Sequence, residues 1–233
     1  MKFIIEYDIF RIFPDLRIGI VLGRGLRVRK CLKELGNLIE DNRKKLLERM
    51  ENKKLTDFTN IKPWRETYRQ LGLNHDKYIP TVEALVRRMI KGYTLPVINT
   101  AVDAYLAVEL LTMLPISGYD LAVVDGDISL RVSNGGELFV ASKRNEFTSS
   151  GEFVYSDNKT ILTRHWNYRY SNHSQISENS TEIILTSEAA LKDIHTRDLI
   201  ETLYKTVEYE SIFCQGTYST FILDKNNAEV ELL

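Results

Sequence analysis

Three groups of polar side chains stand where a functional site could form. The first is Asn99 with Asp103, which lie four residues apart and so share one face of a predicted helix. That helix is otherwise apolar nearly all round from Ile98 to Leu114, which predicts that it is buried. A buried polar pair needs partners or a purpose. Asn99 and Asp103 therefore either cap and anchor the helix or serve a site.

The other two groups follow this helix in the chain. Asp120 ends the segment Pro-Ile-Ser-Gly-Tyr-Asp (115–120), where it either caps a turn or faces a ligand. The segment Arg-His-Trp-Asn-Tyr-Arg (164–169) mixes cations, donors and aromatic rings at the end of a predicted strand. This mixture suits stacking on a base or gripping a phosphate or carboxylate. A cross-strand ladder on the surface would have the same composition, so both interpretations stay open.

Standard catalytic motifs are absent from the sequence. It contains no P-loop, no Gly-x-Ser-x-Gly elbow and no His-Glu-x-x-His motif. A Gly23-x-Gly25 turn precedes a helical pattern, but Val28 replaces the third glycine of a dinucleotide fingerprint, which favours a plain strand-to-helix turn. The histidines His75, His165, His173 and His195 lack metal-ligand spacing. We therefore expect no cofactor and no metal.

Composition points to an ordinary globular protein. The chain has 233 residues, of which 43% are hydrophobic and 27% charged. No apolar run approaches the ~18–20 residues that span a membrane. Glu6 and Asp8 interrupt the first apolar run, which argues against a signal peptide. Two cysteines, Cys31 and Cys214, are expected as free buried thiols in a reducing compartment. We expect a cytoplasmic protein without a membrane partner.

Nucleic-acid contact would have to be local, because the net charge is only −1. The best basic patch follows the glycine turn and has Lys33 and Glu34 beside it. Its members are Arg24, Arg27, Arg29 and Lys30. The patch is either an RNA-backbone contact or ordinary surface. We expect no DNA partner.

Helices in the first half and near the end must position these residues, with strands between them. Proline before a periodic pattern opens a helix and proline after it prevents continuation; Pro80, Pro96 and Pro115 stand at such places. Helices are predicted over 29–52, 63–71, 82–91, 98–114 and 196–210. Strands are predicted over 3–7, 16–22, 121–124, 128–132, 137–141, 152–155, 161–166, 182–186 and 219–223. This order predicts an α+β fold with an antiparallel sheet or partial barrel. No linker is evident, so we predict one domain over 1–233.

An ordered set of segments also resembles a known family. The segments are 68–72, 78–85, 95–103, 114–120, 126–131, 136–137 and 164–167. In this set the chain resembles the tRNA-editing domain of the phenylalanyl-tRNA synthetase β subunit, in its freestanding form. The resemblance implies a central antiparallel sheet flanked by helices and a pocket where the two halves meet. In the synthetase, that pocket hydrolyses the ester of tRNA wrongly charged with tyrosine.

The resemblance implies roles for residues of this chain, and tRNA with a misacylated 3′ end as the partner. Ester hydrolysis needs a positioned water and donors for the oxyanion, which Asn99, Ser117 and Asn167 would supply. Arg164 or Arg169 would hold the terminal nucleotide, and Asp103 would fix the geometry or recognise an amino group. Asp120, Glu137 and Trp166 complete the expected substrate pocket. The predicted activity is deacylation of misacylated tRNA in trans, and the alternative is a non-catalytic module that binds tRNA or an amino acid.

The chain departs from the synthetase pattern in two places. The synthetase carries a histidine where this chain has Ser117. Its acidic residue that recognises the tyrosine hydroxyl lies in a glycine-rich loop, whereas the segment Trp-Asn-Tyr-Arg (166–169) has neither glycine nor acid. The tyrosine-specific recognition therefore does not carry over. Either the amino acid recognised is different, or the ligand is not aminoacyl-tRNA.

Overall fold

The computed structural model describes residues 1–74, 77–95, 97–141 and 144–232, and it has the predicted α+β class. Its helices are α1 (Tyr7–Ile12), α2 (Lys33–Arg49), the short 3-10 helix η1 (Leu55–Asp57), α3 (Lys62–Gln70), α4 (Thr81–Ile90), α5 (Thr100–Thr112) and α6 (Thr196–Cys214). Its strands are β1 (Lys2–Ile5), β2 (Arg17–Arg24), β3 (Ile116–Asp120), β4 (Ile128–Val132), β5 (Leu138–Val140), β6 (Asn145–Phe147), β7 (Phe153–Ser156), β8 (Ile161–Arg164), β9 (Arg169–Tyr170), β10 (Glu182–Ala189), β11 (Thr217–Leu223) and β12 (Glu229–Glu231).

The strands form two sheets. The four-stranded sheet has the order β11-β2-β10-β3 and is antiparallel throughout. The eight-stranded sheet has the order β12-β1-β4-β7-β8-β5-β6, with β9 paired to β8. Two of its pairs, β1 with β4 and β5 with β8, are parallel. The sequence pattern therefore identified the class and most strands, but not their division between two sheets.

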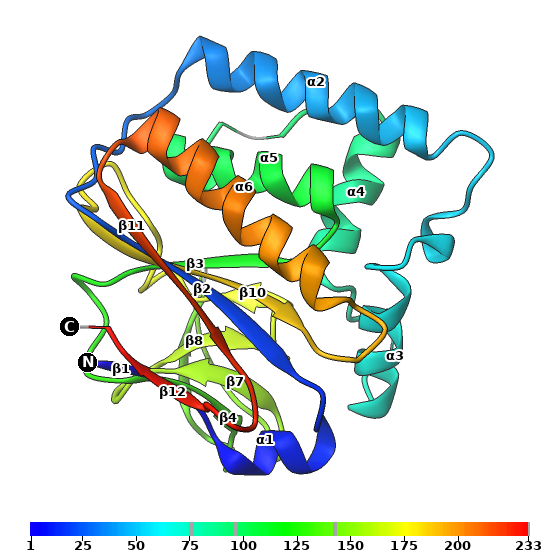
Figure 1. The fold of residues 1–233 in the computed structure, drawn as a ribbon. Helices are drawn as coiled ribbons and strands as arrows, with labels where there is room; N and C mark the ends of the chain where they lie inside the picture. Colours follow the sequence, from blue (N-terminus) through cyan, green and yellow to red (C-terminus); the bar gives the residue numbers. More distant parts are fainter. Residues whose placement is uncertain (75–76, 96, 142–143, 233) are drawn as a thin grey trace.

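The four-stranded sheet is the central layer of the molecule. The helices α5 and α6 cover one face, α2 lies over α5, and the eight-stranded sheet lies beneath the other face (Figure 1). Successive side chains of a strand point to opposite faces. Ile18, Ile20 and Leu22 of β2 accordingly enter the core between the sheets, while Val21 packs among residues of α5 and α6. Both faces of β2 are therefore buried.

Helix α5 is the buried helix that the apolar pattern predicts. It lies between α2 and α6, and most of its residues are buried. Met113, in the left-handed region at φ 56°, follows its last turn. The other predicted helices agree to within a few residues, although α2 begins four residues late. Pro80 is the N-cap of α4, whereas Pro96 and His75 lie outside the described residues.

One predicted strand is wrong and several short elements were not predicted. Residues 121–124 were predicted as a strand but form none. The strand in this region is β3 (Ile116–Asp120), which follows α5 directly. Its register sets Ser117 opposite Thr186 of β10, a long-range pairing that local pattern cannot reveal. A Cβ on Gly118 would lie 2.8 Å from Ile176 and Leu185, so this glycine permits close packing rather than a turn. Elements α1, β6, β9 and β12 are too short to carry a periodic signal.

Two further expectations concern cysteines and membranes. Both cysteines are free; Cys214 is buried as predicted, whereas Cys31 is exposed. Within the described ranges, no helix has the length and apolar content to cross a bilayer.

Candidate functional site

A cavity of about 480 Å³ lies where the helical half meets the sheets, and we call it the α4–α5 cavity. Its walls come from the loop before α4, from α4 and α5, from the start of β3 and from the β8–β9 turn with β9. The lining residues are Lys77, Ile79, Thr81, Ala84, Leu85, Arg88, Leu95, Tyr105, Leu106, Glu109, Ile116, Tyr168 and Tyr170. A largely apolar wall with a few polar groups is typical of a small-molecule site.

Glu109 is the carboxyl group of this cavity. It lies on α5, is only 2% exposed, and its Oε1 accepts a hydrogen bond of 2.8 Å from the Ile116 backbone N–H. Burial, with a smaller contribution from the nearby Glu188 carboxyl, raises the pKa of Glu109 to about 8. The carboxyl group is therefore mostly protonated at neutral pH, so it can donate a hydrogen bond as well as accept one.

Two tyrosines add neutral hydroxyl groups to the same cavity. The Tyr170 hydroxyl lies 3.0 Å from the Ser117 Oγ, which joins β9 to β3. Burial raises the pKa of Tyr170 and Tyr105 above the ordinary tyrosine value, so both keep their protons. Each hydroxyl can donate and accept. The cavity thus holds several hydrogen-bonding groups without a fixed charge at neutral pH.

The rim of the cavity carries cations and aromatic rings. Lys77 and Arg88 line it, and Arg88 Nε donates to the Thr94 carbonyl at 3.3 Å. Tyr78 packs edge-on against His165 and Tyr168, with ring centroids 4.4 and 5.1 Å apart. Cations beside aromatic faces suit a nucleotide, whose base stacks and whose phosphate pairs.

Asn99 and Asp103 do not line this cavity. Asn99 Oδ1 accepts from the Val102 N–H at 3.0 Å, and its Nδ2 donates to the Ile176 carbonyl at 2.9 Å. Asp103 Oδ1 accepts from the Ile98 N–H at 3.1 Å. Asn99 thus caps α5, because a helix leaves its first N–H groups unpaired and Asn99 accepts from one of them. Asp103 anchors the backbone just before the helix, and neither residue lines the α4–α5 cavity.

Asp120 and Glu137 also lie elsewhere. Asp120 accepts from the Ala122 N–H at 3.0 Å and from the Ser180 hydroxyl at 2.6 Å, so it caps the turn after β3. Glu137 pairs with Arg131 and accepts from the Ser133 hydroxyl. Neither side chain lines the α4–α5 cavity. Asp120 ends β3 and Glu137 directly precedes β5, so both lie outside this cavity.

The segment 164–169 divides between the core and an ion-pair ladder. Trp166 is fully buried, with ring centroids 5.2 Å from Phe13, 5.4 Å from Trp64 and 5.6 Å from Phe153. It therefore cannot stack on a ligand, and its expected substrate contact is corrected. Asn167, also buried, accepts from the Tyr68 hydroxyl at 2.8 Å, behind the cavity wall.

The two arginines of this segment form the cross-strand ladder. Arg164 pairs with Glu152 at 2.7 Å and with Glu146 at 3.1 Å, and Arg169 pairs with Glu146 at 2.9 Å. Their donors are thus largely engaged by carboxylates, as in the cross-strand ladder that the sequence also allowed. The cavity has other polar lining residues, among them Glu109, Tyr105 and Tyr170, which the sequence patterns did not single out. A carboxylate in the middle of a mostly apolar helix is a signal that could have identified Glu109.

The predicted basic patch lies beside the N-terminus of α5. The Arg29 N–H donates to the Thr100 Oγ1 at 3.0 Å, and the Thr100 N–H donates to the Arg29 carbonyl at 2.8 Å. Arg24 bonds to the Leu232 carbonyl and faces Glu182 at 4.0 Å. Arg27 and Lys30 are exposed. Those two remain the best placed of the four to meet an RNA backbone.

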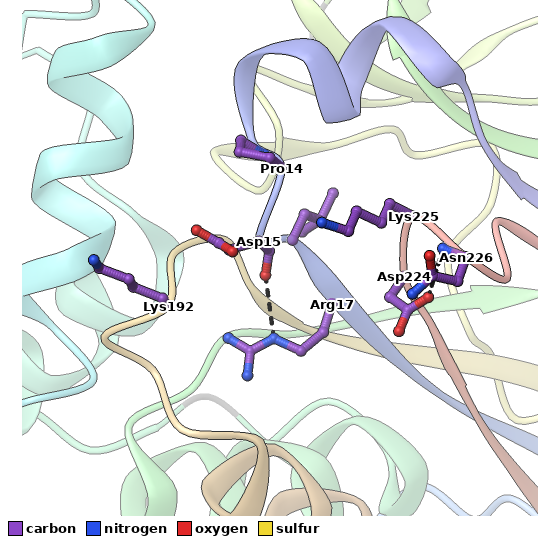
Figure 2. A pocket seen from close by; sticks show the side chains of 8 residues that line it. Pro14, Asp15, Arg17, Lys192, Asp224, Lys225 and Asn226 are labelled. Carbon is purple, nitrogen blue, oxygen red and sulfur yellow. Dashed lines mark hydrogen bonds between the residues drawn. The ribbon is translucent and has the colours of Figure 1, made fainter.

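Another cavity, of about 270 Å³, lies beside Arg17 and is less suited to a ligand (Figure 2). Arg17 donates to the carbonyl groups of Asp15, Leu191 and Ile194 and to the Thr196 hydroxyl. The guanidinium therefore ties β2 to the β10–α6 loop and has little left to offer an anion. Nowhere in the described ranges do three His, Cys, Asp or Glu side chains gather as a metal site.

Comparison with known proteins points to one domain family. The model of the B3/4 domain matches residues 63–201, a range that includes every residue lining the α4–α5 cavity. The B3/4 domain is found in the phenylalanyl-tRNA synthetase β subunit, so the resemblance seen in the sequence segments is confirmed. No curated protein sequence matches the chain.

One similar solved structure is an N-terminal fragment of the phenylalanyl-tRNA synthetase β subunit from Pyrococcus horikoshii, with a TM-score of 0.46 and 9% sequence identity. The alignment covers 98% of this chain and 53% of that one, so the chain spans about half of the fragment's length.

Proposed function

Because the chain belongs to the B3/4 domain family, we propose that its α4–α5 cavity binds the aminoacyl end of a misacylated tRNA and hydrolyses the ester. The observation that carries this proposal is the position of Glu109 and Tyr170, two neutral hydrogen-bond donors in a largely apolar cavity at the junction of helices and sheets. The amino acid side chain lies against the apolar wall. The terminal nucleotide lies at the rim, near Lys77 and Arg88.

Hydrolysis in this cavity uses a water molecule as the nucleophile. The Tyr170 hydroxyl, held by Ser117, orients the ester or the attacking water. The protonated Glu109 carboxyl donates to the oxygen on which negative charge develops. The metal-free route needs no covalent intermediate, and the leaving ribose hydroxyl takes up a proton from the attacking water.

The proposal fits a general limit on amino acid selection. A hydrophobic pocket separates similar side chains by only ~10–200-fold, so a second, hydrolytic site is needed where errors matter. A cavity of about 480 Å³ has room for an amino acid side chain as well as part of the ribose.

The test is deacylation of a panel of mischarged tRNAs by the purified chain. We expect one or a few of them to lose their amino acid faster than the spontaneous rate, and Tyr170→Phe to slow that loss. Glu208→Gln, which removes an exposed carboxylate of α6, is the matched control and keeps full activity. If no tRNA is deacylated above the spontaneous rate, the hydrolytic function is refuted.

A second function, binding without catalysis, is favoured by the neutral state of the polar groups. Glu109 and the two buried tyrosines keep their protons near pH 7, so none is a strong base. A tRNA binder that contacts several phosphates loses affinity steeply as salt rises. The melting temperature of a protein that binds a free amino acid rises when that amino acid is added and does not change when tRNA is added. Measuring both responses separates these two forms.

A further inference from the structure

A second, smaller cavity lies on the opposite side of α5, between α2 and the segment that joins α4 to α5. Its volume is about 150 Å³, and we call it the Asp103 cavity. Helices α2 and α5 pack side by side along this face (Figure 1). Leu32, Ile39, Met89, Leu95 and Val97 supply an apolar wall. The cavity is separate from the proposed tRNA site, although Leu95 borders both.

Asp103 supplies the charged group of this cavity. The residue is only 4% exposed, and its Oδ1 accepts the Ile98 N–H. Its Oδ2 has no hydrogen-bond partner in the described part of the chain. A buried carboxylate without a cation is unfavourable, and burial raises the pKa of Asp103 to about 6. The carboxylate is nevertheless largely ionised at pH 7.5, and it pairs with no cationic side chain among the described residues.

The neighbouring charges do not provide a counter-charge for Asp103. Cys31, Glu40 and Arg43 are the other titratable or charged groups that line the cavity. Arg43 is 2.9 Å from Glu40, so its charge is already paired. Cys31 is exposed and free. The cavity therefore offers one unpaired negative charge at the end of an apolar chamber.

Gly36 borders the chamber and is itself exposed. It lies inside α2, where glycine is less favourable than alanine by about 1 kcal/mol. No heavy atom lies within 4 Å of the position where its Cβ would stand. A side chain at this position would extend beside the cavity rather than clash with backbone. The open space beside the cavity thus lies at a helix position occupied by glycine, which is less favourable in a helix than alanine.

We propose that the Asp103 cavity binds a primary alkylammonium ion, with its nitrogen on the free Asp103 Oδ2 and its carbon chain against the apolar wall. An ammonium group can donate to a single free oxygen. A guanidinium group prefers a bidentate carboxylate, and here Oδ1 is already engaged. The cavity volume of about 150 Å³ suits a short alkyl chain, and n-butylammonium serves as the probe.

The test is calorimetric titration of the full chain with n-butylamine hydrochloride at pH 7.5, with n-butanol and sodium butyrate as equal-length controls. We expect millimolar affinity for the amine, at least about tenfold weaker binding of the alcohol, and no binding of the acid. Saturating amine should also slow alkylation of the exposed Cys31 by iodoacetamide. Cys214 is buried and stays unreactive.

Three changes locate the binding. Asp103→Asn keeps an acceptor for the Ile98 N–H but removes the charge, and we expect at least a tenfold loss of affinity. Asp41→Asn, which removes an exposed carboxylate of the same helical layer, leaves affinity unchanged. Gly36→Leu places a side chain at the border of the chamber and is expected to weaken binding at least tenfold, while the melting temperature does not fall. Lowering the pH from 7.5 to 5 weakens binding, because Asp103 takes up a proton.

The proposal is overturned if the amine does not bind at tens of millimolar, or binds no better than the alcohol. It is equally overturned if Asp103→Asn binds as tightly as the original chain. Should that variant fail to fold, Gly36→Leu and the pH series decide alone, and unchanged affinity in either one refutes the site. None of these results depends on tRNA deacylation.

Discussion

Glu109 Oε1 accepts a hydrogen bond of 2.8 Å from the Ile116 backbone N–H, which ties the buried helix α5 to the first residue of β3. Oε1 is therefore held by the backbone, and the carboxyl borders the α4–α5 cavity. Only the last turn of α5 and residues 113–115, with Met113 in the left-handed region, separate these two residues, and the bond holds β3 against the helix that precedes it.

The first prediction concerns stability and pH. Glu109 has a pKa of about 8 in the folded protein, compared with an ordinary value of 4.5. Between these values the folded state holds a proton that the unfolded state has released, so the free energy of unfolding falls as pH rises. Glu109→Gln mimics the protonated form and should remove this part of the fall, on the order of 3 kcal/mol between pH 5 and 8.5.

Urea unfolding of both proteins at several pH values measures the effect. Glu188 has a pKa raised to about 7 by burial, so some slope of the same sign remains in the variant. Glu208→Gln is the exposed control and should follow the original chain. Parallel curves for Glu109→Gln and the original chain would show that Glu109 is ionised in the fold at neutral pH.

The second prediction concerns Tyr170 and its hydroxyl. Tyr170→Phe removes the contact with Ser117 and should cost about 1 kcal/mol of stability. If Tyr170 orients the ester or the water, deacylation of the preferred mischarged tRNA should fall about 100-fold. Single-turnover kinetics provides the measurement. Tyr204→Phe, at an exposed position of α6, should change neither quantity. Full activity in Tyr170→Phe would remove this hydroxyl from the mechanism.

The third prediction follows from the core position of Trp166. Its ring meets three aromatic rings edge-on or tilted, and none of its side chain is exposed. Trp166→Ala should destabilise the fold by about 3–5 kcal/mol, because it removes a large apolar side chain and leaves a cavity. Circular dichroism during urea unfolding measures this loss. A cost below 1 kcal/mol would contradict the core assignment.

The fourth prediction compares a buried ion pair with an exposed one. Glu152 is about 1% exposed in its side chain and pairs with Arg164 at 2.7 Å. Glu152→Gln should cost about 3 kcal/mol, because it leaves a buried cation partly unpaired. Arg69→Ala, in the exposed pair with Glu66, should cost less than about 1 kcal/mol. Equal losses in chemical denaturation would refute the contrast.

The fifth prediction tests the basic patch with RNA. Arg27 and Lys30 are exposed beside the N-terminus of α5. If they contact phosphates, Arg27→Ala and Lys30→Ala should each reduce the salt slope of tRNA affinity by about one. Lys53→Ala, in the loop after the C-terminal end of α2, is the control. Unchanged slopes in both patch variants would assign the patch to ordinary surface.

The sequence by itself determined the class of the fold and most of its helices. Proline positions and the apolar run of 98–114 predicted the buried helix α5, and the ordered segments between 68 and 167 predicted the family. These features succeed because helix signals are local and because a set of motifs in fixed order is specific. Asn99 and Asp103 were also recognisable as a polar pair at the start of this helix.

Only the tertiary structure decided which side chains meet. Asn99 and Asp103 face a different side of α5 from Glu109, and a helical period alone does not say which face borders a cavity. The segment around Trp166 has the composition of a ligand-stacking site, but the Trp166 ring packs against aromatic rings of the core. Strand register and the packing of two sheets set these positions, and both depend on contacts between residues far apart in the chain. The composition of the candidate site is therefore a property of that packing.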